Sequence, residues 1–280
     1  MSTRCKFAAL SLAVACTLTL LASAAQTDPS LPDSAFSATV CPVVYQLDES
    51  PSARGYHYSF FGNAFFIYEQ GYLLTAAHVL DTFRNGGQPY ILVDRPDSPP
   101  RLLRAVVIAV DSQHDVAILR ATPNPFDGKF RVAFLPLSSV APTPGQSVLA
   151  LSLHPLKVQS AHTFEFPQED RSAGEVLSYQ STQLEKSAPA AEVFLLSHSV
   201  SHGQSGSPVV GLDSHAVVGF IEGRWLRSSG VAASATDNQT YSIPGVAVPI
   251  RHAIALLQRE HIPWHAGSLE PPNSVPAHKP

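Results

Sequence analysis

The sequence FFGNAFFIYEQGYLLTAAHVL, residues 60–80, holds two apolar runs separated by a short polar segment. The first run, residues 60–68, is rich in aromatic side chains, a composition that predicts a β-strand. The second run passes through small residues into residues 76–83, where we expect a short helical segment. His78 lies at this change of structure. A lone histidine there is usually structural, so any role for it depends on what accompanies it elsewhere in the chain.

Similar short runs of β-branched and aromatic residues, each bounded by Gly, Pro, Asn or Asp, recur along the chain. Because no helical segments alternate with them, the pattern predicts an all-β barrel or sandwich. A single helix is expected at residues 250–260, where Ile250, Ile254 and Leu257 share one face, and it would cap the last barrel. The predicted strands are residues 60–68, 90–93, 102–110, 116–119, 147–152, 174–179, 193–196, 208–210, 217–221 and 246–250.

Proline-rich residues 122–145 divide the predicted strands into two groups of similar size. We interpret this segment as the connector between two β-barrels. Residues 155–173 are expected to form a long surface loop. Residues 26–40 are polar and turn-forming, and residues 266–280 are rich in Pro, Ser and Gly. A flexible N-terminal segment and a disordered tail are therefore expected on either side of a folded domain at residues 41–265.

The first 25 residues have the organisation of a secretory signal peptide. Arg4 and Lys6 precede an apolar run at residues 7–21, and small residues follow at 22–25. The run is shorter than the roughly 20 residues of a membrane-spanning helix. Lipidation of Cys16 is the alternative, but the residues before it lack the usual leucine. We expect an exported protein, periplasmic or extracellular, with no membrane anchor after signal cleavage.

Charge and cysteine content limit the partners and the compartment. Loss of residues 1–25 would leave 16 basic and 22 acidic residues, and a mildly acidic chain predicts no nucleic-acid partner. Cys5 and Cys16 lie in the predicted signal, which leaves Cys41 without an intramolecular partner. An exported domain without disulfides fits the bacterial periplasm better than animal secretion. Cys41 is expected to be a buried apolar residue, with pairing between chains as the alternative.

Ser205 is the third residue of GQSGSP, directly before a predicted strand. A nucleophilic serine needs a tight turn that presents its hydroxyl in a cleft while backbone N–H groups face the developing oxyanion. Gly203 and Gly206 permit such a turn, although the same cluster also suits an ordinary one. Asp115 stands at the head of another predicted strand, where a turn or capping role is the alternative. The order His78, Asp115, Ser205, each at a strand end, favours one catalytic set.

These segments resemble the trypsin-like serine proteases, nearest to the bacterial HtrA (Deg) type, over residues 60–260. The resemblance implies two six-stranded β-barrels with a C-terminal helix. It also implies a catalytic triad of His78, Asp115 and Ser205, with Asp115 rather than Asp111 in the catalytic place. The segments that carry it are FGNAFFI at 61–67, GYLLTAAHV at 71–79, VIAVD at 107–111, HDVAIL at 114–119, GQSGSP at 203–208 and GVAVPI at 245–250.

The mechanism implied by this resemblance assigns each residue a role. His78 takes the Ser205 proton as general base, and Asp115 orients the imidazole and stabilises its charged form. The backbone N–H groups of Gly203 and Ser205 would form the oxyanion hole. No metal or cofactor is needed.

The substrate pocket would include Ser199, His202, Ile221 and Glu222. No acidic residue lies in residues 198–204, which together with Ile221 predicts a preference for apolar residues before the cut; Glu222 could reverse it by attracting a cation. A zinc pair formed by His198 and His202, four residues apart, is a weaker alternative use of this segment.

Three departures from the family pattern change what we expect. No second domain follows the predicted helix, so a peptide-binding module is not expected. Ser207 replaces the second glycine, as in glutamyl endopeptidases, but Ile221 stands where those enzymes have a histidine, so glutamate specificity is not expected. Gln204 replaces the aspartate that pairs with a new amino terminus in animal zymogens. The oxyanion loop should therefore be ordered by its own hydrogen bonds, or by substrate or partner contacts, without an activating cut.

The sequence thus predicts an exported serine endopeptidase that acts on protein or peptide substrates through an acyl-enzyme. An esterase-like acyl hydrolase with the same triad is one alternative, since the triad serves acyl transfer in general. A catalytically idle binding module on a protease fold is the other, because fold does not determine function. The sequence specifies neither the natural substrate nor the oligomeric state.

Overall fold

The computed structural model describes residues 39–46, 58–85, 87–93, 101–126, 133–154, 168–185, 188–224 and 243–267. All of them belong to one compact unit, Leu31–Pro280. The predicted signal peptide and most of both predicted flexible ends lie outside the described residues. Among the described helices, none is long and apolar enough to cross a membrane.

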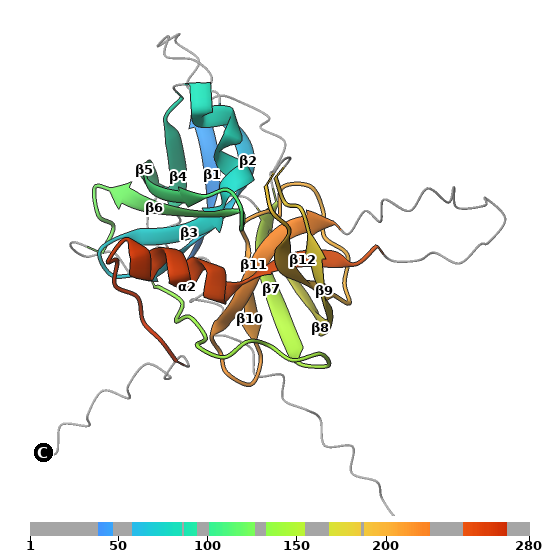
Figure 1. Cartoon of the computed structure of the whole chain (residues 1–280). Coiled ribbons are helices and arrows are strands. Elements are labelled where there is room, and N and C mark those ends of the chain that lie inside the picture. The colour runs from blue at the N-terminus through green and yellow to red at the C-terminus, as the bar shows by residue number, and fades with distance from the viewer. Residues whose placement is uncertain are drawn as a thin grey trace, which may run out of the picture. The chain divides into compact units, whose positions relative to one another are not determined.

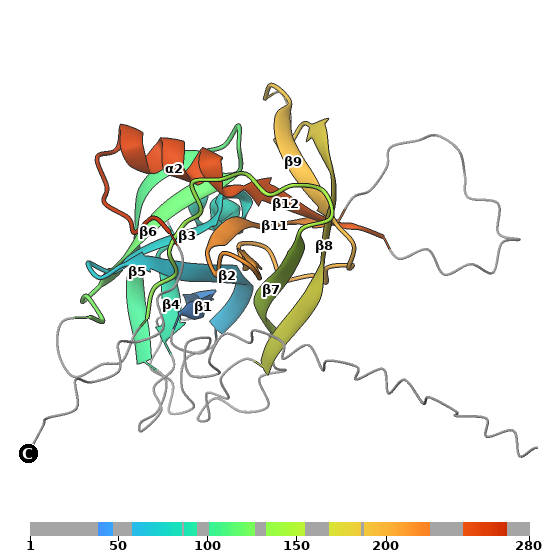
Figure 2. The same ribbon diagram turned by 90° about the horizontal axis from the view of Figure 1, so that it is seen from below.

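Within the described residues, twelve antiparallel strands form two closed six-stranded barrels. Figures 1 and 2 show how their strands are arranged. The first barrel closes in the order β1-β2-β3-β6-β5-β4 and the second in the order β10-β11-β12-β9-β8-β7. This architecture confirms the predicted all-β fold with two barrels and a C-terminal helix. The strands of the first barrel are β1 (Val40–Gln46), β2 (Tyr58–Tyr68), β3 (Tyr72–Ala76), β4 (Pro89–Val93), β5 (Arg101–Asp111) and β6 (Val116–Thr122). Those of the second are β7 (Ser147–His154), β8 (Gln168–Thr182), β9 (Ala191–Leu196), β10 (Pro208–Gly211), β11 (Val217–Arg224) and β12 (Gly245–Pro249).

The structure differs from the expected elements in three places. Strand β1 was not predicted, since Pro42 interrupts its apolar run; it pairs with both β2 and β4. The expected loop at 155–173 is wrong for residues 168–173, which are the first part of β8; residues 155–167 lie outside the described residues. The sequence of residues 168–173 is polar, but backbone pairing with β7 holds these residues in the sheet. The expected helical segment is a 3-10 helix, η1 (Ala77–Asn85).

The C-terminal helix α2 (Ile250–Arg259) packs on both barrels and does not cap the last one alone. It leaves β12 and runs beside β6 of the first barrel (Figures 1 and 2). Its buried face consists of Ile250, Ala253, Leu256 and Leu257, while Ile254 is only partly buried. One apolar core includes these residues with side chains of β3, β6 and β11. The helix therefore holds the start of β6 and the end of β3 near β11, where the predicted catalytic residues gather.

Candidate active site

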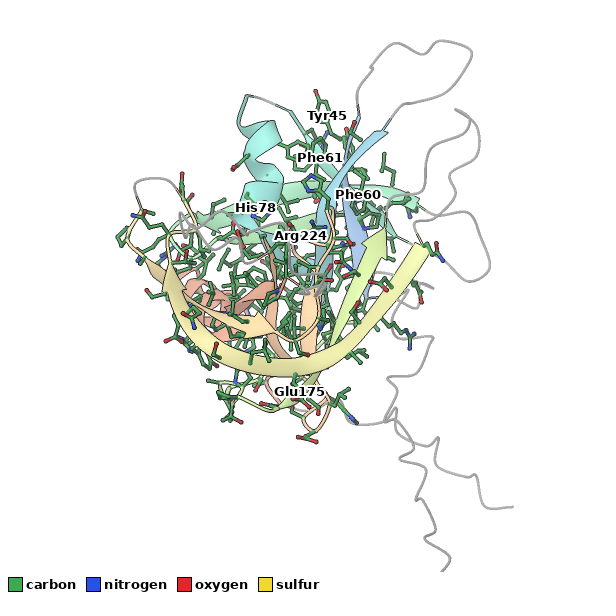
Figure 3. All side chains as sticks on the ribbon, turned by 90° about the vertical axis from the view of Figure 1, so that its right-hand side faces the viewer. Tyr45, Phe60, Phe61, His78, Glu175 and Arg224 are labelled. Carbon is green, nitrogen blue, oxygen red and sulfur yellow. The ribbon has the colours of Figure 1, made fainter. Side chains whose placement is uncertain are left out.

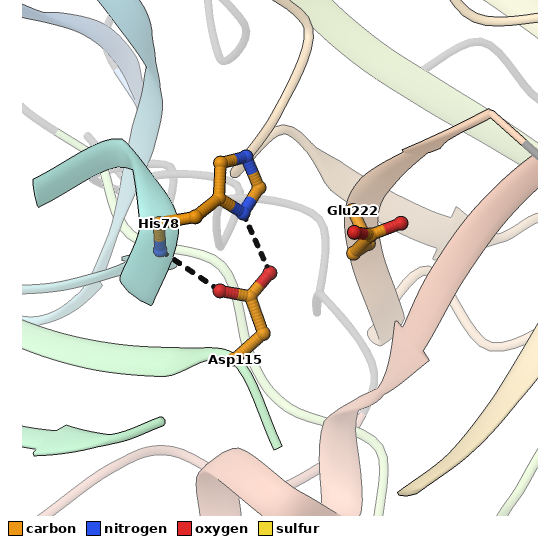
Figure 4. A group of neighbouring side chains, drawn as sticks. All are labelled: His78, Asp115 and Glu222. Carbon is orange, nitrogen blue, oxygen red and sulfur yellow. Dashed lines mark hydrogen bonds and ion pairs between the residues drawn. The ribbon is translucent and has the colours of Figure 1, made fainter. Parts of the chain in front are cut away.

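His78 and Asp115 are joined by both backbone and side-chain hydrogen bonds (Figure 4). His78 is the second residue of η1, directly after β3, and Asp115 precedes β6 with a left-handed φ of 55°. The Ala77 amide donates to the Asp115 carbonyl at 3.0 Å, and the His78 amide donates to Asp115 Oδ1 at 2.8 Å. His78 Nδ1 lies 2.8 Å from Asp115 Oδ2. The turn before β6 thus fixes the carboxylate, and the carboxylate fixes the imidazole.

The electrostatic setting of His78 suits a base. The Asp115 side chain is only 6% exposed, whereas that of His78 is 40% exposed. Burial lowers the pKa of His78, but the hydrogen bond and charge of Asp115, with the charges of Glu222 and Asp81, raise that pKa overall. Because an ionised carboxylate only accepts hydrogen bonds, the pair places the neutral imidazole's proton on Nδ1 and leaves a lone pair on Nε2.

Ser205 lies in a tight turn directly before β10. Gly203 and Gly206 on either side of Gln204 and Ser205 have φ of 91° and 81°, values that glycine adopts without strain. A Cβ at Gly206 would collide with the Asn63 carbonyl and the Thr75 hydroxyl, so the turn approaches β2 and β3 too closely for a side chain there. Within the described part of the chain, the amides of Gly203 and Ser205 donate no hydrogen bond.

Among the described residues, the Ser205 hydroxyl is hydrogen-bonded to a backbone carbonyl and not to His78. Its Oγ donates to the backbone carbonyl of Glu222 on β11 at 3.0 Å, and no hydrogen bond among the described residues joins it to the imidazole. The Ser205 backbone is nevertheless close to η1, because a Cβ at Gly62 would meet both the Ser205 carbonyl and the Val79 side chain at 2.7 Å. The two barrels therefore bring His78, Asp115 and the serine turn to one junction.

Asn63, which the sequence analysis did not single out, connects the serine turn to β2 and β7. Its side chain is fully buried. Its amide nitrogen donates to the carbonyls of Gly203 at 3.0 Å and Leu153 at 3.3 Å, and its Oδ1 accepts from the Leu153 amide at 3.2 Å. Its backbone amide donates to the Ser205 carbonyl at 2.8 Å. The only sequence signal for this role is one amide side chain inside an otherwise apolar and small-residue run.

Gln204 is buried beneath the serine turn and ties it to β8. Its Oε1 accepts from the Ser201 amide, and its Nε2 donates to Asp170 Oδ2 at 2.8 Å. Asp170 was also missed, because it lay within the segment expected to be a loop. These hydrogen bonds agree with the expectation that the turn is ordered from within the domain.

The predicted pocket residues occupy different settings. Ser199 and His202 are exposed, Ile221 is fully buried in the core of the second barrel, and Glu222 is half-buried with its carboxylate facing His78 (Figure 4). His198 lies close enough to Asp170 for that charge to oppose the lowering of its pKa by burial. Residues 198–204 themselves contain no acidic residue, but Asp170 brings a carboxylate to this segment from another strand.

Asp111 has a histidine partner of its own. His114 Nδ1 lies 2.8 Å from Asp111 Oδ2, and the His114 ring stacks on that of His252 at 4.2 Å. Two separate His–Asp pairs are thus present among the described residues, and of these two the pair formed by His78 and Asp115 lies beside the serine turn.

Comparisons with known proteins bear on the family and the fold of this chain. The family model "Trypsin-like peptidase domain" matches residues 62–220. No curated protein has a significantly similar sequence.

Three solved structures show the same fold. The HtrA-type protease AlgW, solved with a tripeptide, is 19% identical with a TM-score of 0.54, over 80% of this chain and 60% of that one. An inactive mutant form of Rv3671c from M. tuberculosis H37Rv is 17% identical with a TM-score of 0.52, over 81% and 89%. The MamO protease domain from Magnetospirillum magneticum is 17% identical with a TM-score of 0.53, over 80% and 98%. The chain thus spans less than two thirds of the AlgW chain. Because all three identities are below 20%, the similarity to these structures is limited to the fold.

Proposed function

Because the chain belongs to the trypsin-like peptidase family, we propose that it is an exported serine endopeptidase with Ser205 as nucleophile, His78 as general base and Asp115 as the residue that orients the base. One observation carries the proposal: the hydrogen-bonded pair of His78 and Asp115 stands at the same barrel junction as a glycine-flanked serine turn. Family membership supports serine protease activity in general, and the assignment of the residues rests on this geometry.

In the proposed reaction, a proton passes from Ser205 to His78, whose ring Asp115 orients. The Ser205 hydroxyl leaves the Glu222 carbonyl and gives its proton to Nε2 of His78 as Oγ attacks the substrate carbonyl. Asp115 keeps the proton on Nδ1 and stabilises the resulting imidazolium. The oxyanion would be bound by the amides of Gly203 and Ser205, which donate no hydrogen bond within the described residues, and such an interaction typically contributes about 3 kcal/mol per donor to the transition state. His78 then gives the proton from Ser205 to the leaving amine as the peptide C–N bond breaks, which leaves the acyl group on Ser205 Oγ. A water that loses its proton to His78 hydrolyses this acyl-enzyme, and the proton returns to Ser205 Oγ.

We also propose peptide bonds as the substrate, since AlgW was solved with a tripeptide and a decapeptide. A mixed peptide library should be cleaved chiefly after small or medium apolar residues. Cleavage chiefly after Lys or Arg would refute this preference and would point to Asp170 or Glu222 as the residue that attracts the cation.

The assignment of Ser205 is tested by labelling the purified protein with a fluorophosphonate, which reacts only with activated serines. We expect Ser205→Ala to abolish both labelling and peptide hydrolysis. Ser207→Ala is the matched control, because the Ser207 hydroxyl is buried two residues away and has no hydrogen-bond partner among the described residues. It should leave labelling near that of the unchanged protein.

The same experiment separates the alternatives. If the protein is folded but is not labelled, the proposal is contradicted and an idle binding module is supported. The hydrogen bond from the Ser205 hydroxyl to the Glu222 carbonyl is the observation that favours this alternative. A protein that is labelled and cleaves esters but no peptide would be an acyl hydrolase of another class.

A further inference from the structure

The Glu222 carboxylate has no part in the mechanism proposed above, yet it faces the His78 ring across from Asp115 (Figure 4). Its ligating oxygen, one oxygen of Asp115 and one ring nitrogen of His78 all lie within 4.8 Å of one another. Strand β11 places it there, and its own backbone carbonyl holds the Ser205 hydroxyl. An imidazole and two carboxylates thus converge at the mouth of the site.

The charge of this group is not balanced by the protein. No Lys or Arg side chain in the described part of the chain forms an ion pair with Asp115 or Glu222, and the nearby Arg224 donates instead to the Val200 carbonyl. Two carboxylates that repel each other beside one neutral imidazole attract a cation.

We propose that His78, Asp115 and Glu222 form a binding site for Zn²⁺ or a similar divalent transition-metal ion, and that the bound ion inhibits the enzyme. One nitrogen and two oxygen ligands with an open fourth position are typical of three-ligand zinc sites. Zn²⁺ binds such ligands at about 2.0–2.2 Å in a tetrahedral arrangement, so two ligand atoms of one ion lie about 3.4 Å apart. The three ligand atoms now lie within 4.8 Å of one another, so the half-buried Glu222 side chain has to move inward. His78 Nδ1 and Asp115 Oδ2, now 2.8 Å apart, have to separate slightly as the ion replaces the hydrogen bond between them. The imidazole ligand favours Zn²⁺ over Mg²⁺ or Ca²⁺.

Inhibition follows from the imidazole proton. Nδ1 now carries the proton that it donates to Asp115, and a metal ion bound to Nδ1 needs the lone pair there. The proton of the neutral ring then moves through solvent from Nδ1 to Nε2, so the ring neither gains nor loses a proton overall. Nε2 consequently has no lone pair to accept the Ser205 proton, and the ring is no longer oriented by Asp115.

Binding is tested in the Ser205→Ala variant, so that the result does not depend on whether the proposed peptidase activity exists. Titration calorimetry with ZnCl₂ should show one ion bound per chain at this site, and Glu222→Gln in the same background should weaken that binding at least about tenfold. The matched control is Glu175→Gln, since Glu175 is exposed on β8 far from His78 (Figure 3) and should leave Zn²⁺ affinity unchanged. MgCl₂ should not compete.

Two results would overturn the proposal. One is the absence of Zn²⁺ binding at millimolar ZnCl₂, and the other is a Glu222→Gln protein that binds as tightly as its parent. Loss of binding on Asp111→Asn instead would place the ion on the other His–Asp pair. In the protein with Ser205 intact, Zn²⁺ should slow hydrolysis and EDTA should restore it. In the Glu222→Gln variant, the same Zn²⁺ concentration should inhibit hydrolysis less.

Discussion

Asn63→Ala tests whether β2 positions the serine turn. The substitution removes three hydrogen bonds: two donated to the Gly203 and Leu153 carbonyls and one accepted from the Leu153 amide. Leaving a buried donor or acceptor without a partner costs about 1–3 kcal/mol. The Leu153 amide loses the acceptor that Asn63 provides, while the two carbonyls each keep a second lone pair. We therefore expect the free energy of unfolding to fall by about 2–4 kcal/mol.

The same change should slow catalysis beyond its effect on folding. The Gly203 carbonyl belongs to the peptide next to one of the two amides proposed for the oxyanion hole, and Asn63 is the side chain that holds that carbonyl. We expect fluorophosphonate labelling of the folded fraction to slow by about tenfold or more, the loss seen when oxyanion donors are disturbed. The measurement combines urea unfolding with the labelling rate at low urea.

A second variant separates positioning from stability. In Asn63→Asp the side chain keeps its size and still accepts from the Leu153 amide, but its ionised form cannot donate to Gly203. Protonation of His78 slows labelling of every variant as the pH is lowered, so the rate is compared with that of the parent at the same pH. This relative rate should recover partly as the introduced carboxyl gains a proton. Asn124→Ala, at the far end of β6 from Asp115, is the control. If Asn63→Ala is labelled as fast as the parent and is equally stable, the reasoning is refuted.

Three further changes give distinct outcomes. Asp115→Asn should lower peptide hydrolysis by several orders of magnitude while Asp111→Asn should not, and the reverse result in a hydrolysis assay would show that the wrong His–Asp pair was chosen. Gln204→Glu replaces the donor to Asp170 with a second carboxylate, so labelling should slow by about tenfold or more, and adding Asp170→Asn should restore part of the rate by supplying a donor. Burial, followed by the charges of nearby cations, lowers the pKa of His252 from 6.5 to about 4. Its neutral form therefore stabilises the fold above about pH 6.5, and thermal unfolding should show stability lost between that pH and about 4. His252→Gln should make thermal stability depend less on pH in this range. If the pH profile of that variant is unchanged, His252 is not the group responsible for the loss of stability.

The sequence predicted the strands and the proposed catalytic residues better than the contacts that hold them in place. His78, Asp115 and Ser205 could be proposed as one set because their order along the chain and the segments around them resemble the family's motifs. Asn63 could not be proposed, since its partners Leu153 and Gly203 are 90 and 140 residues away in sequence. Strand β1 was missed because Pro42 breaks a run whose strand character comes from pairing with β2 and β4.

Residues 168–173 were missed for a related reason. Their polar composition is typical of a loop, and only the partner strand β7 determines that they are extended. Asp170 shares this segment, so its interaction with Gln204, 34 residues away, could not be foreseen from local pattern. Signals that depend on a distant partner are absent from a single sequence.

The division of the proposed site between two barrels has a consequence for how the protein is made. The base and its carboxylate belong to the barrel that is synthesised first, whereas the serine turn belongs to the second, which is completed by β12 and then packed by α2. A chain whose second barrel is still being synthesised therefore lacks the serine turn of the proposed site. If the proposal holds, activity can appear only after the last residues of the domain have arrived, because one apolar core joins both barrels and α2.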